Sequence, residues 1–241
     1  MYEFGFRCDT GRVRDINQDA FFVIPEKGVF LIADGVGGHN NGELASRTAM
    51  TDIAEYIKEN PIPVELGAEE LKNYFVSLVF AVNRHIYNIA RESAPEGMAT
   101  TLVILFISGG KAYVVNVGDS RLYLLRDENM IQVTEDHTYV NGLVKKGIID
   151  EEQARTHPDR NMITRAVGAE HDVEPDLFLF DVYGGDIILM CTDGLYNELS
   201  DSEMHDMVLN SRDMRTACSE LVDEANRRGG TDNITAVSVR I

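Results

Sequence analysis

The stretch Val-Phe-Leu-Ile-Ala-Asp-Gly at residues 29–35 joins five consecutive apolar residues to an aspartate and a glycine. An apolar run of this length, bounded by turn-forming residues, is typical of a strand buried on both faces. A second stretch, Leu-Met-Cys-Thr-Asp-Gly at residues 189–194, repeats the pattern. Each stretch therefore predicts a buried strand that ends at a carboxylate.

Three further aspartates lie at the ends of expected strands, namely Asp19, Asp119 and Asp232. Taken singly, Asp-Gly and Gly-Asp pairs are most simply hairpin turns. Strand ends can converge in space, however, and five carboxylates in one place would repel one another strongly unless cations were bound between them. Oxygen ligands favour Mg²⁺ or Mn²⁺ over zinc. The glycine after Asp34 would let a backbone carbonyl approach the same ion.

Two such ions side by side would lower the pKa of a bridging water and give a hydroxide for in-line attack on phosphorus. A phosphate ester also needs a fixed positive charge for its non-bridging oxygens. Arg14, five residues before Asp19, is a candidate because a guanidinium binds phosphate in a bidentate fork. A solvated surface arginine is the simpler alternative.

The order of apolar patterns predicts an α+β fold. Helices are expected at 42–58, 68–91, 202–210 and 215–227, a short one near 151–155, and strands at 20–24, 29–33, 100–107, 112–117, 121–125, 130–133, 177–182, 186–192 and 234–241. Helices arrive in pairs and strands in hairpins, which favours antiparallel sheets inside and helix pairs outside over a parallel sheet. Because no linker, low-complexity tract or repeat is evident, we expect a single domain over residues 1–241.

The composition excludes several classes of protein. A formal charge of −18 over 241 residues argues against a partner that is a nucleic acid or an anionic membrane. No apolar run approaches the ~20 residues that span a bilayer, and the start lacks a signal-peptide pattern, so we expect a cytoplasmic protein. Its three cysteines, Cys8, Cys191 and Cys218, are too few and too far apart for a disulfide framework or a CxxC zinc pair.

Seven short motifs, in this order, resemble the 2C-type metal-dependent protein serine/threonine phosphatases, the PPM family, in its compact bacterial form. They are Arg14–Asp19, Ala33–His39 with Gly42–Ser46, Gly97–Leu102, Val117–Arg121, Ile163–Gly168, Thr192–Leu195 and Gly229–Thr235. Each motif alone is weak, but the ordered set covers nearly the whole chain and is specific.

The resemblance implies a four-layer α-β-β-α sandwich of two antiparallel β-sheets flanked by helix pairs, with Mn²⁺ or Mg²⁺ in a cleft at one end. It implies the following ligands: Asp19 bridges two ions, Asp34 and the Gly35 carbonyl bind one, Asp193 and Asp232 bind the other, and Asp119 with Asp193 holds a possible third. Arg14 would bind the phosphate, Asn233 would orient the site, and Thr100 and Thr101 would be structural.

One position departs from many relatives outside bacteria, which carry a histidine directly after the Asp-Gly pair. Here that residue is Val36, so the proton for the leaving alcohol would come from water on an ion, with the third ion as the hypothesis. Residues 132–169 correspond to the family's variable flap, whose His157, Arg160 and Arg165 could contact substrate. An ordinary solvated loop is the alternative.

The expected activity is hydrolysis of phosphoserine and phosphothreonine in proteins. The expected partners are phosphorylated proteins, including a cognate bacterial serine/threonine kinase, and we expect a monomer. Two other functions remain open. One is an inactive phosphoprotein-binding pseudophosphatase that keeps the fold. The other is a cysteine-dependent phosphatase, because Cys8 and Arg14 form a C-x5-R pattern, although Asp9 beside the cysteine would disfavour its thiolate.

Overall fold

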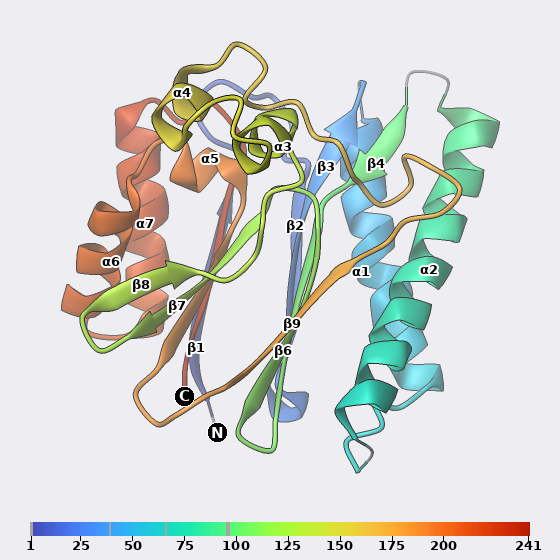
Figure 1. Cartoon of the computed structure of the whole chain (residues 1–241), viewed down its shortest axis with the longest axis horizontal. Helices are drawn as coiled ribbons and strands as arrows, with labels where there is room; N and C mark the ends of the chain where they lie inside the picture. The colour runs from blue at the N-terminus through green and yellow to red at the C-terminus, as the bar shows by residue number, and fades with distance from the viewer. Residues whose placement is uncertain (1, 39, 66, 95–96) are drawn as a thin grey trace.

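The computed structural model describes residues 2–38, 40–65, 67–94 and 97–241. Two antiparallel sheets face each other in it, and helices cover the outside of both, which confirms the expected α+β sandwich (Figure 1). One sheet has the strand order β1 (Glu3–Asp9), β11 (Ile234–Arg240), β10 (Ile187–Cys191), β7 (Arg121–Arg126), β8 (Asn129–Gln132). The other has the order β2 (Asp19–Ile24), β3 (Val29–Gly37), β5 (Leu102–Ser108), β6 (Lys111–Val117), β9 (Asp176–Asp181), with β4 (Met98–Thr100) paired to β3.

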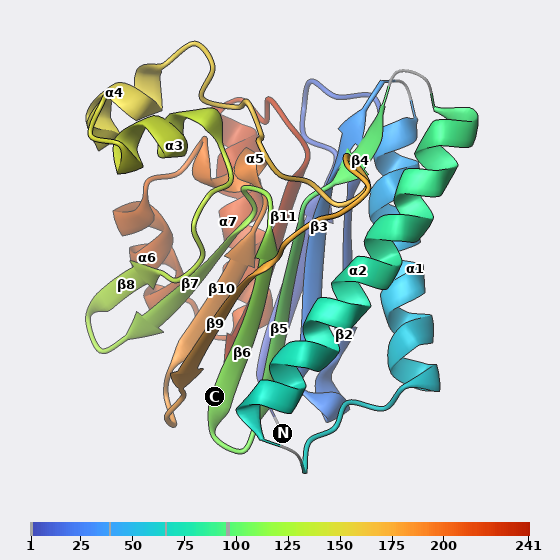
Figure 2. The ribbon, with the colours of Figure 1, turned by 45° about the vertical axis from the view of Figure 1, so that its right-hand side comes forward.

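The helices fall into two outer pairs and a group of short ones. The first pair is α1 (Asn41–Glu59) and α2 (Ala68–Ser93), and the second pair is α6 (Asp201–Asn210) and α7 (Met214–Arg228). The short helices are η1 (Pro25–Lys27), α3 (Tyr139–Lys145), α4 (Glu151–Thr156) and α5 (Asp193–Tyr196). In Figure 2, α3 and α4 project beyond the ends of the strands, near α5. None of the helices in the described ranges is long and apolar enough to cross a membrane.

The interior strand β3 shows why the apolar runs are continuous. Leu31 and Ala33 pack into the core beneath α1 and α2, whereas Phe30 and Ile32 pack into the core between the two sheets. Alternate side chains of a strand point to opposite faces, so a strand covered on both faces needs apolar residues at every position. A third core lies between the other sheet and α6 and α7.

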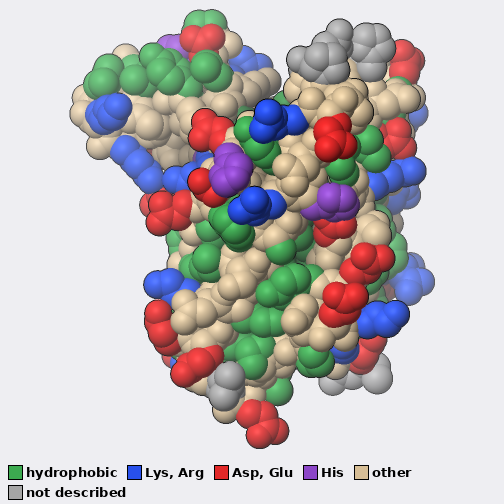
Figure 3. All heavy atoms as spheres, turned by 90° about the vertical axis from the view of Figure 1, so that its right-hand side faces the viewer, with side chains coloured by type: hydrophobic (Ala, Val, Ile, Leu, Met, Phe, Trp, Pro, Cys, Tyr) green, Lys and Arg blue, Asp and Glu red, His purple; other side chains and the backbone are tan. Residues whose placement is uncertain are grey.

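The helical face in Figure 3 carries interspersed acidic and basic side chains.

Several elements differ from the sequence expectation. Strand β1 and helices α3 and α5 were not expected, and the expected strand 100–107 is divided between β4 and β5. Strand β1 is largely half-buried and includes Gly5, so it lacks a strong apolar signal. Helix α5 begins at Asp193 itself, and Asp34 lies inside β3 because that strand continues to Gly37 to pair with β4. Neither Asp34 nor Asp193 is therefore the last residue of a strand.

A buried asparagine fixes the end of the segment 132–169 to helix α2. The side chain of Asn83 donates to the carbonyls of Glu170 and His171 at 3.1 and 3.0 Å and accepts the Gly168 N–H at 2.7 Å. Gly168 has φ +90°, and a Cβ there would lie 2.2 Å from Ile86 Cγ2. The chain therefore reaches the asparagine only because residue 168 is glycine.

Replacing Asn83 tests this anchor. We expect Asn83→Ala to lower the free energy of unfolding by about 2 kcal/mol, because it leaves buried backbone groups unpaired. Urea unfolding followed by circular dichroism measures the change. Asn73→Ala, an exposed position on the same helix, is the control and should change stability by less than about 0.5 kcal/mol. Equal effects of the two substitutions would contradict the anchor.

Candidate functional site

The five aspartates come together at one end of the sandwich, around Asp34. The side chain of Asp34 is repelled by the other four carboxylates, those of Asp19, Asp193, Asp119 and Asp232. Asp19 lies directly opposite Asp34 in the β2–β3 ladder. Like charges at directly opposed strand positions destabilise a sheet. The arrangement is therefore unfavourable unless something compensates the charge.

Burial and mutual repulsion raise the pKa of these carboxyl groups. Burial raises the pKa of Asp19 to about 7 and that of Asp119 to about 8, with the charge of Asp193 adding to both. Burial and the neighbouring Asp232 raise the pKa of Asp193 to about 6. Burial and the charge of Asp19 raise the pKa of Asp34 well above its ordinary value. The cluster therefore resists carrying its full negative charge in the absence of cations.

Asp19 connects the two sheets and keeps one oxygen unpaired. Its Oδ2 accepts the hydroxyl of Thr192 at 2.8 Å and that of Thr235 at 2.6 Å. Thr235 lies in β11 of the opposite sheet, and Thr192 directly follows β10 of that sheet. Its Oδ1 is buried and has no hydrogen-bond partner among the residues that the structure describes. An unpaired buried carboxylate oxygen is costly. This oxygen is the observation that fits a bound cation best.

The backbone of Asp34 is fixed by the two threonines that the sequence marked as structural. Its N–H donates to Thr101 Oγ1 at 2.8 Å, and its carbonyl accepts from the Thr100 hydroxyl at 2.9 Å and the Thr101 N–H at 2.8 Å. Thr101 Oγ1 also lies 2.7 Å from Ser120 Oγ, next to Asp119. These contacts hold the main chain and leave the Asp34 carboxylate to the cluster.

The glycines of both Asp-Gly pairs are required by close approach of another backbone. A Cβ on Gly35 would lie 2.0 Å from the Gly42 carbonyl oxygen, and one on Gly194 would lie 2.0 Å from the Asn233 carbonyl oxygen. The segments around Gly35 and Gly194 are therefore in direct contact with the other motifs of the site. His39, at the end of the motif that begins at Ala33, lies outside the described residues.

Arg14 lies at the rim of the cluster on a loop that Asn233 holds. Arg14 Nη2 donates to Asp232 Oδ2 at 2.7 Å, and the arginine side chain is about half exposed. Asn233 Oδ1 accepts the Gln18 N–H at 2.8 Å, while its Nδ2 donates to the carbonyls of Thr10 and Ile16, both at 2.9 Å. This asparagine thus connects the loop that carries Arg14 to the start of β11.

The donor set fits a hard divalent cation with an incomplete protein cage. Within the described part of the chain, no three Asp, Glu, His or Cys side chains are grouped so that they could hold an ion by themselves. Mg²⁺ usually keeps several waters and takes only one or two carboxylates from a protein. Carboxylates, a backbone carbonyl and water would therefore complete such a site, and the unpaired Asp19 oxygen would gain a partner.

The expected substrate residues of the flap segment, residues 132–169, bond within that segment or to the chain at the start of β9. Arg165 forms an ion pair with Asp176 at 2.7 Å and donates to the Glu174 carbonyl at 3.0 Å. His157 ends α4, where its Nδ1 accepts the Asp159 N–H at 3.1 Å. Arg160 is exposed on the same segment. The structure thus gives Arg165 a role in bracing the flap segment, leaves Arg160 on its surface, and places the half-buried ring of His157 beside Tyr139 of α3.

Cys8 does not have the surroundings of a catalytic thiolate. It lies on strand β1 rather than at a helix N-terminus, and its Sγ accepts a hydrogen bond from Asn17 Nδ2 at 3.0 Å. Burial and the charge of Asp19 raise the pKa of its thiol. A nucleophilic cysteine requires the opposite shift. The geometry therefore argues against the C-x5-R alternative.

The sequence did not point to the neutral side chains that organise these carboxylates. Thr192, Thr235 and Tyr196 contact the cluster or its main chain. Thr192 directly precedes the second Asp-Gly pair, so its position in that motif was a usable signal. Tyr196 had no such signal, because helix α5 was not expected.

The raised pKa values predict how stability depends on pH in the absence of metal. Between about pH 5 and pH 8 the folded protein binds more protons at Asp19, Asp119 and Asp193 than the unfolded chain does, so stability falls as pH rises. In chelator, we expect Asp19→Asn to raise the Tm at about pH 8 by about 4 °C, equivalent to ~1.5 kcal/mol, and to change it less at about pH 5. Calorimetry at both pH values checks this.

The control for this prediction is Asp223→Asn, at an exposed aspartate of α7 whose ion-pair partner, Arg7, keeps its charge at both pH values. It should leave the pH dependence unchanged. Mn²⁺ should raise the Tm of the wild type at the higher pH. A stabilisation by Asp19→Asn that is the same at both pH values would contradict the charge explanation.

Comparisons with known proteins agree with this geometry along the whole chain. The family model described as Protein phosphatase 2C matches residues 12–228. The Serine/threonine phosphatase stp of Listeria innocua is 37% identical over 238 residues, which cover 97% of this chain and 94% of that protein. The Protein phosphatase PhpP of Streptococcus pneumoniae is 34% identical over 240 residues, covering 98% and 96%.

Two solved structures of bacterial phosphatases are similar to this structure. The crystal structure of the Mycobacterium tuberculosis serine/threonine phosphatase PstP/Ppp has a TM-score of 0.90 at 34% identity and covers 100% of this chain and 98% of its own. The catalytic domain of PstP in complex with two manganese ions has a TM-score of 0.86 at 33% identity, covering 99% and 97%. The chain therefore belongs to the protein phosphatase 2C family, the metal-dependent protein serine/threonine phosphatases that its motifs resemble.

Proposed function

We propose that this chain hydrolyses phosphoserine and phosphothreonine in proteins, in a reaction that depends on Mn²⁺ or Mg²⁺. The observation that carries the proposal is the buried carboxylate cluster, which includes the unpaired Oδ1 of Asp19 and has Arg14 at its rim. The manganese ions in the structure of the related catalytic domain support the metal dependence. The names of the bacterial relatives support the substrate class.

The hydrogen bonds suggest how the ligands are shared. The resemblance implies that Asp19 bridges two ions, but its Oδ2 already accepts two hydroxyls. The Asp34 carboxylate is central to the cluster, and only its main chain is used by Thr100 and Thr101. We therefore propose Asp34 as the shared ligand, with Asp19 supplying its free oxygen. The Gly35 carbonyl, Asp193 and Asp232 complete the core sites, and Asp119 with Asp193 forms a third.

Arg14 is the group proposed to bind the substrate phosphate. In the absence of metal its guanidinium pairs with Asp232. A cation on Asp232 would compete with this pair, so the N–H groups of the arginine would become available to the non-bridging oxygens of the phosphate. Asn233 would keep the loop in place during this exchange, because it bonds to the loop at three points.

The bound ions would supply a water of lowered pKa for in-line attack on phosphorus. The chain contributes orientation and charge around that water rather than a proton donor after the Asp-Gly pair, because Val36 has no titratable group. Val36 pairs with Ala99 on β4 and is half exposed, so it forms part of the rim. The proton for the leaving alcohol is therefore proposed to come from water.

The physiological setting also remains a proposal. The substrates are expected to be phosphorylated proteins, including a cognate serine/threonine kinase, and the chain is expected to act as a monomer in the cytoplasm. The excess of acidic residues supports a protein partner over nucleic acid. His157 and Arg160 are proposed to contact such substrates from the surface of the flap segment.

One assay distinguishes the three functions under consideration: a metal-dependent phosphatase, a cysteine-dependent phosphatase and an inactive pseudophosphatase. We expect release of phosphate from a phosphoserine peptide with Mn²⁺, its loss in chelator, and its persistence after the thiols are blocked. Activity that survives the chelator and is abolished by thiol blocking would favour Cys8 chemistry. Binding of the peptide with no hydrolysis in any divalent metal would favour the pseudophosphatase.

Substitution of Arg14 tests the phosphate contact. We expect Arg14→Ala to lower kcat/KM for a phosphopeptide by about 100-fold, because it removes a charge-assisted bidentate contact worth ~2–3 kcal/mol. Arg14→Lys keeps the charge and should recover only part of the loss. Steady-state kinetics with saturating Mn²⁺ give both values. Arg227→Ala, at an exposed arginine of α7, is the control, and an equal loss in that variant would overturn the assignment.

A further inference from the structure

The main chain on both sides of Asp119 is held by side chains from other elements. The Tyr196 hydroxyl donates to the Asp119 carbonyl at 3.0 Å. On the other side, the Gly118 N–H donates to His137 Nδ1 at 3.0 Å. Gly118 has φ +105°, so the turn adopts a conformation that favours glycine. The position of the Asp119 carboxylate therefore depends on two hydrogen bonds that its own strand does not supply.

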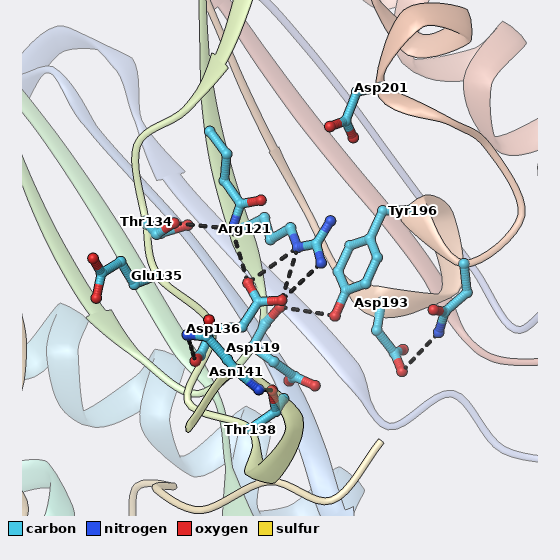
Figure 4. A network of polar contacts seen from close by, with 12 residues as sticks. Asp119, Arg121, Thr134, Glu135, Asp136, Thr138, Asn141, Asp193, Tyr196 and Asp201 are labelled. Atoms are coloured by element: carbon cyan, nitrogen blue, oxygen red, sulfur yellow. Dashed lines mark hydrogen bonds and ion pairs between the residues drawn. The ribbon is translucent and has the colours of Figure 1, made fainter. Parts of the chain in front are cut away.

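Tyr196 connects Asp119 to the other carboxylate of the third candidate site. It ends helix α5, and Asp193 begins that same helix. The helix is only one turn long, so a contact made by its last residue also sets where its first residue lies. Asn197 Nδ2 donates to Asp193 Oδ2 at 3.2 Å and orients that carboxylate. One phenol thus links the backbone segments of Asp119 and Asp193 (Figure 4).

Arg121 holds the ring of Tyr196 in place. Its guanidinium carbon lies 3.6 Å from the centre of the ring, within the range of a cation–π contact. The same guanidinium donates three hydrogen bonds of 2.7–3.1 Å to the carboxylate of Asp136. Arg121 and Asp136 are both largely buried, with side chains 21% and 15% exposed. In Figure 4 the arginine lies between the ring and the aspartate.

Asp136 and His137 lie near the beginning of the flap segment, just before α3. The carbonyl of Asp136 accepts from Asn141 Nδ2 on α3 at 2.6 Å. The N–H of His137 donates to the Gly118 carbonyl at 3.0 Å. Because His137 Nδ1 accepts the Gly118 N–H, the neutral ring carries its hydrogen on Nε2, which faces Asp176 Oδ2 at 3.1 Å. The beginning of the flap segment is thus bonded to the turn that carries Asp119.

We propose that Tyr196, held by Arg121, is a positioning residue for a divalent cation bound between Asp119 and Asp193. This inference rests on the third cation site of the proposed function and assigns the residues that set its geometry. The Tyr196 hydroxyl fixes the position of Asp119 relative to α5. Arg121 fixes the Tyr196 ring, and the same arginine binds Asp136 near the beginning of the flap segment. The affinity of this cation and the packing of the flap segment are therefore coupled.

Two tyrosines on the same arginine provide a matched pair of variants. Tyr196→Phe keeps the ring over Arg121 and removes only the hydroxyl bond to Asp119. Tyr123→Phe also removes a buried hydroxyl, which accepts from Arg121 Nη1 at 3.0 Å and lies 3.2 Å from Asp201, on the side of the arginine away from Asp119. A loss of general packing would affect both variants, whereas the proposed role is specific to Tyr196.

The experiment is calorimetric titration of each variant with Mn²⁺ at a temperature well below its Tm. The wild type should show two tighter sites and one weaker site, and Asp119→Ala should lack the weaker one. Tyr196→Phe should weaken that site by about 5-fold, the equivalent of one hydrogen bond of ~1 kcal/mol. It should weaken the two tighter sites less, because Asp193 is the only one of their proposed ligands that belongs to helix α5. Tyr123→Phe should resemble the wild type at all sites.

Arg121→Lys gives a second test, because lysine keeps the charge but lacks the fork for Asp136 and the planar face for the ring. We expect it to weaken the same site and to increase hydrogen exchange of the amides in α3. Equal effects of Tyr196→Phe and Tyr123→Phe on the weak site would overturn the proposal. So would a weak site that persists in Asp119→Ala. Neither result depends on catalysis, so failure of the phosphatase function would appear separately, as an inactive wild type.

Discussion

Asp19 holds the two sheets together at the end where the carboxylates meet. It begins β2, and both hydroxyls that it accepts come from the side of the opposite sheet, Thr192 after β10 and Thr235 in β11. An ionised carboxylate is an acceptor only, so it can receive both hydroxyls on one oxygen. The other oxygen is thereby held in a buried position, with no hydrogen-bond partner in the described part of the chain. The same contact that joins the sheets creates the need for a cation.

This arrangement explains how a chain with a formal charge of −18 can bind a phosphorylated substrate. From residue 166 to residue 211 the sequence contains eleven acids and no lysine or arginine, and Asp193 lies within that range. Most of these acids are on the surface and repel polyanions such as nucleic acids. Bound divalent cations would reverse the local sign of the field at the cluster, where Arg14 adds its own positive charge. The overall acidity and the local attraction for phosphate are thus compatible.

The sequence predicted the parts of the site that depend on short motifs. The two Asp-Gly pairs in the sequence indicated Asp34 and Asp193. The structure gives the reason for the glycines: another backbone passes so close that only glycine fits, as the approach of the Gly42 carbonyl to Gly35 shows. The sandwich was predictable because continuous apolar runs and paired helices leave few other layers. Contacts between distant segments were not predictable. Helix α5 is too short for a helical period, and the bond from Tyr196 to Asp119 depends on how two sheets are stacked.

The cluster is retained against a cost in stability. Four carboxyl groups have raised pKa values from burial and repulsion, so ionising them in the folded chain without metal costs free energy that the unfolded chain, which hydrates them, does not lose. Three apolar cores offset that cost elsewhere in the molecule. Thr100, Thr101, Asn233 and Tyr196 fix the backbone around the cluster, whereas Thr192 and Thr235 hold the Asp19 carboxylate through one of its oxygens. Because the site is preorganised in this way, a cation gains its ligands without reordering the fold, and the relief of repulsion contributes directly to its affinity.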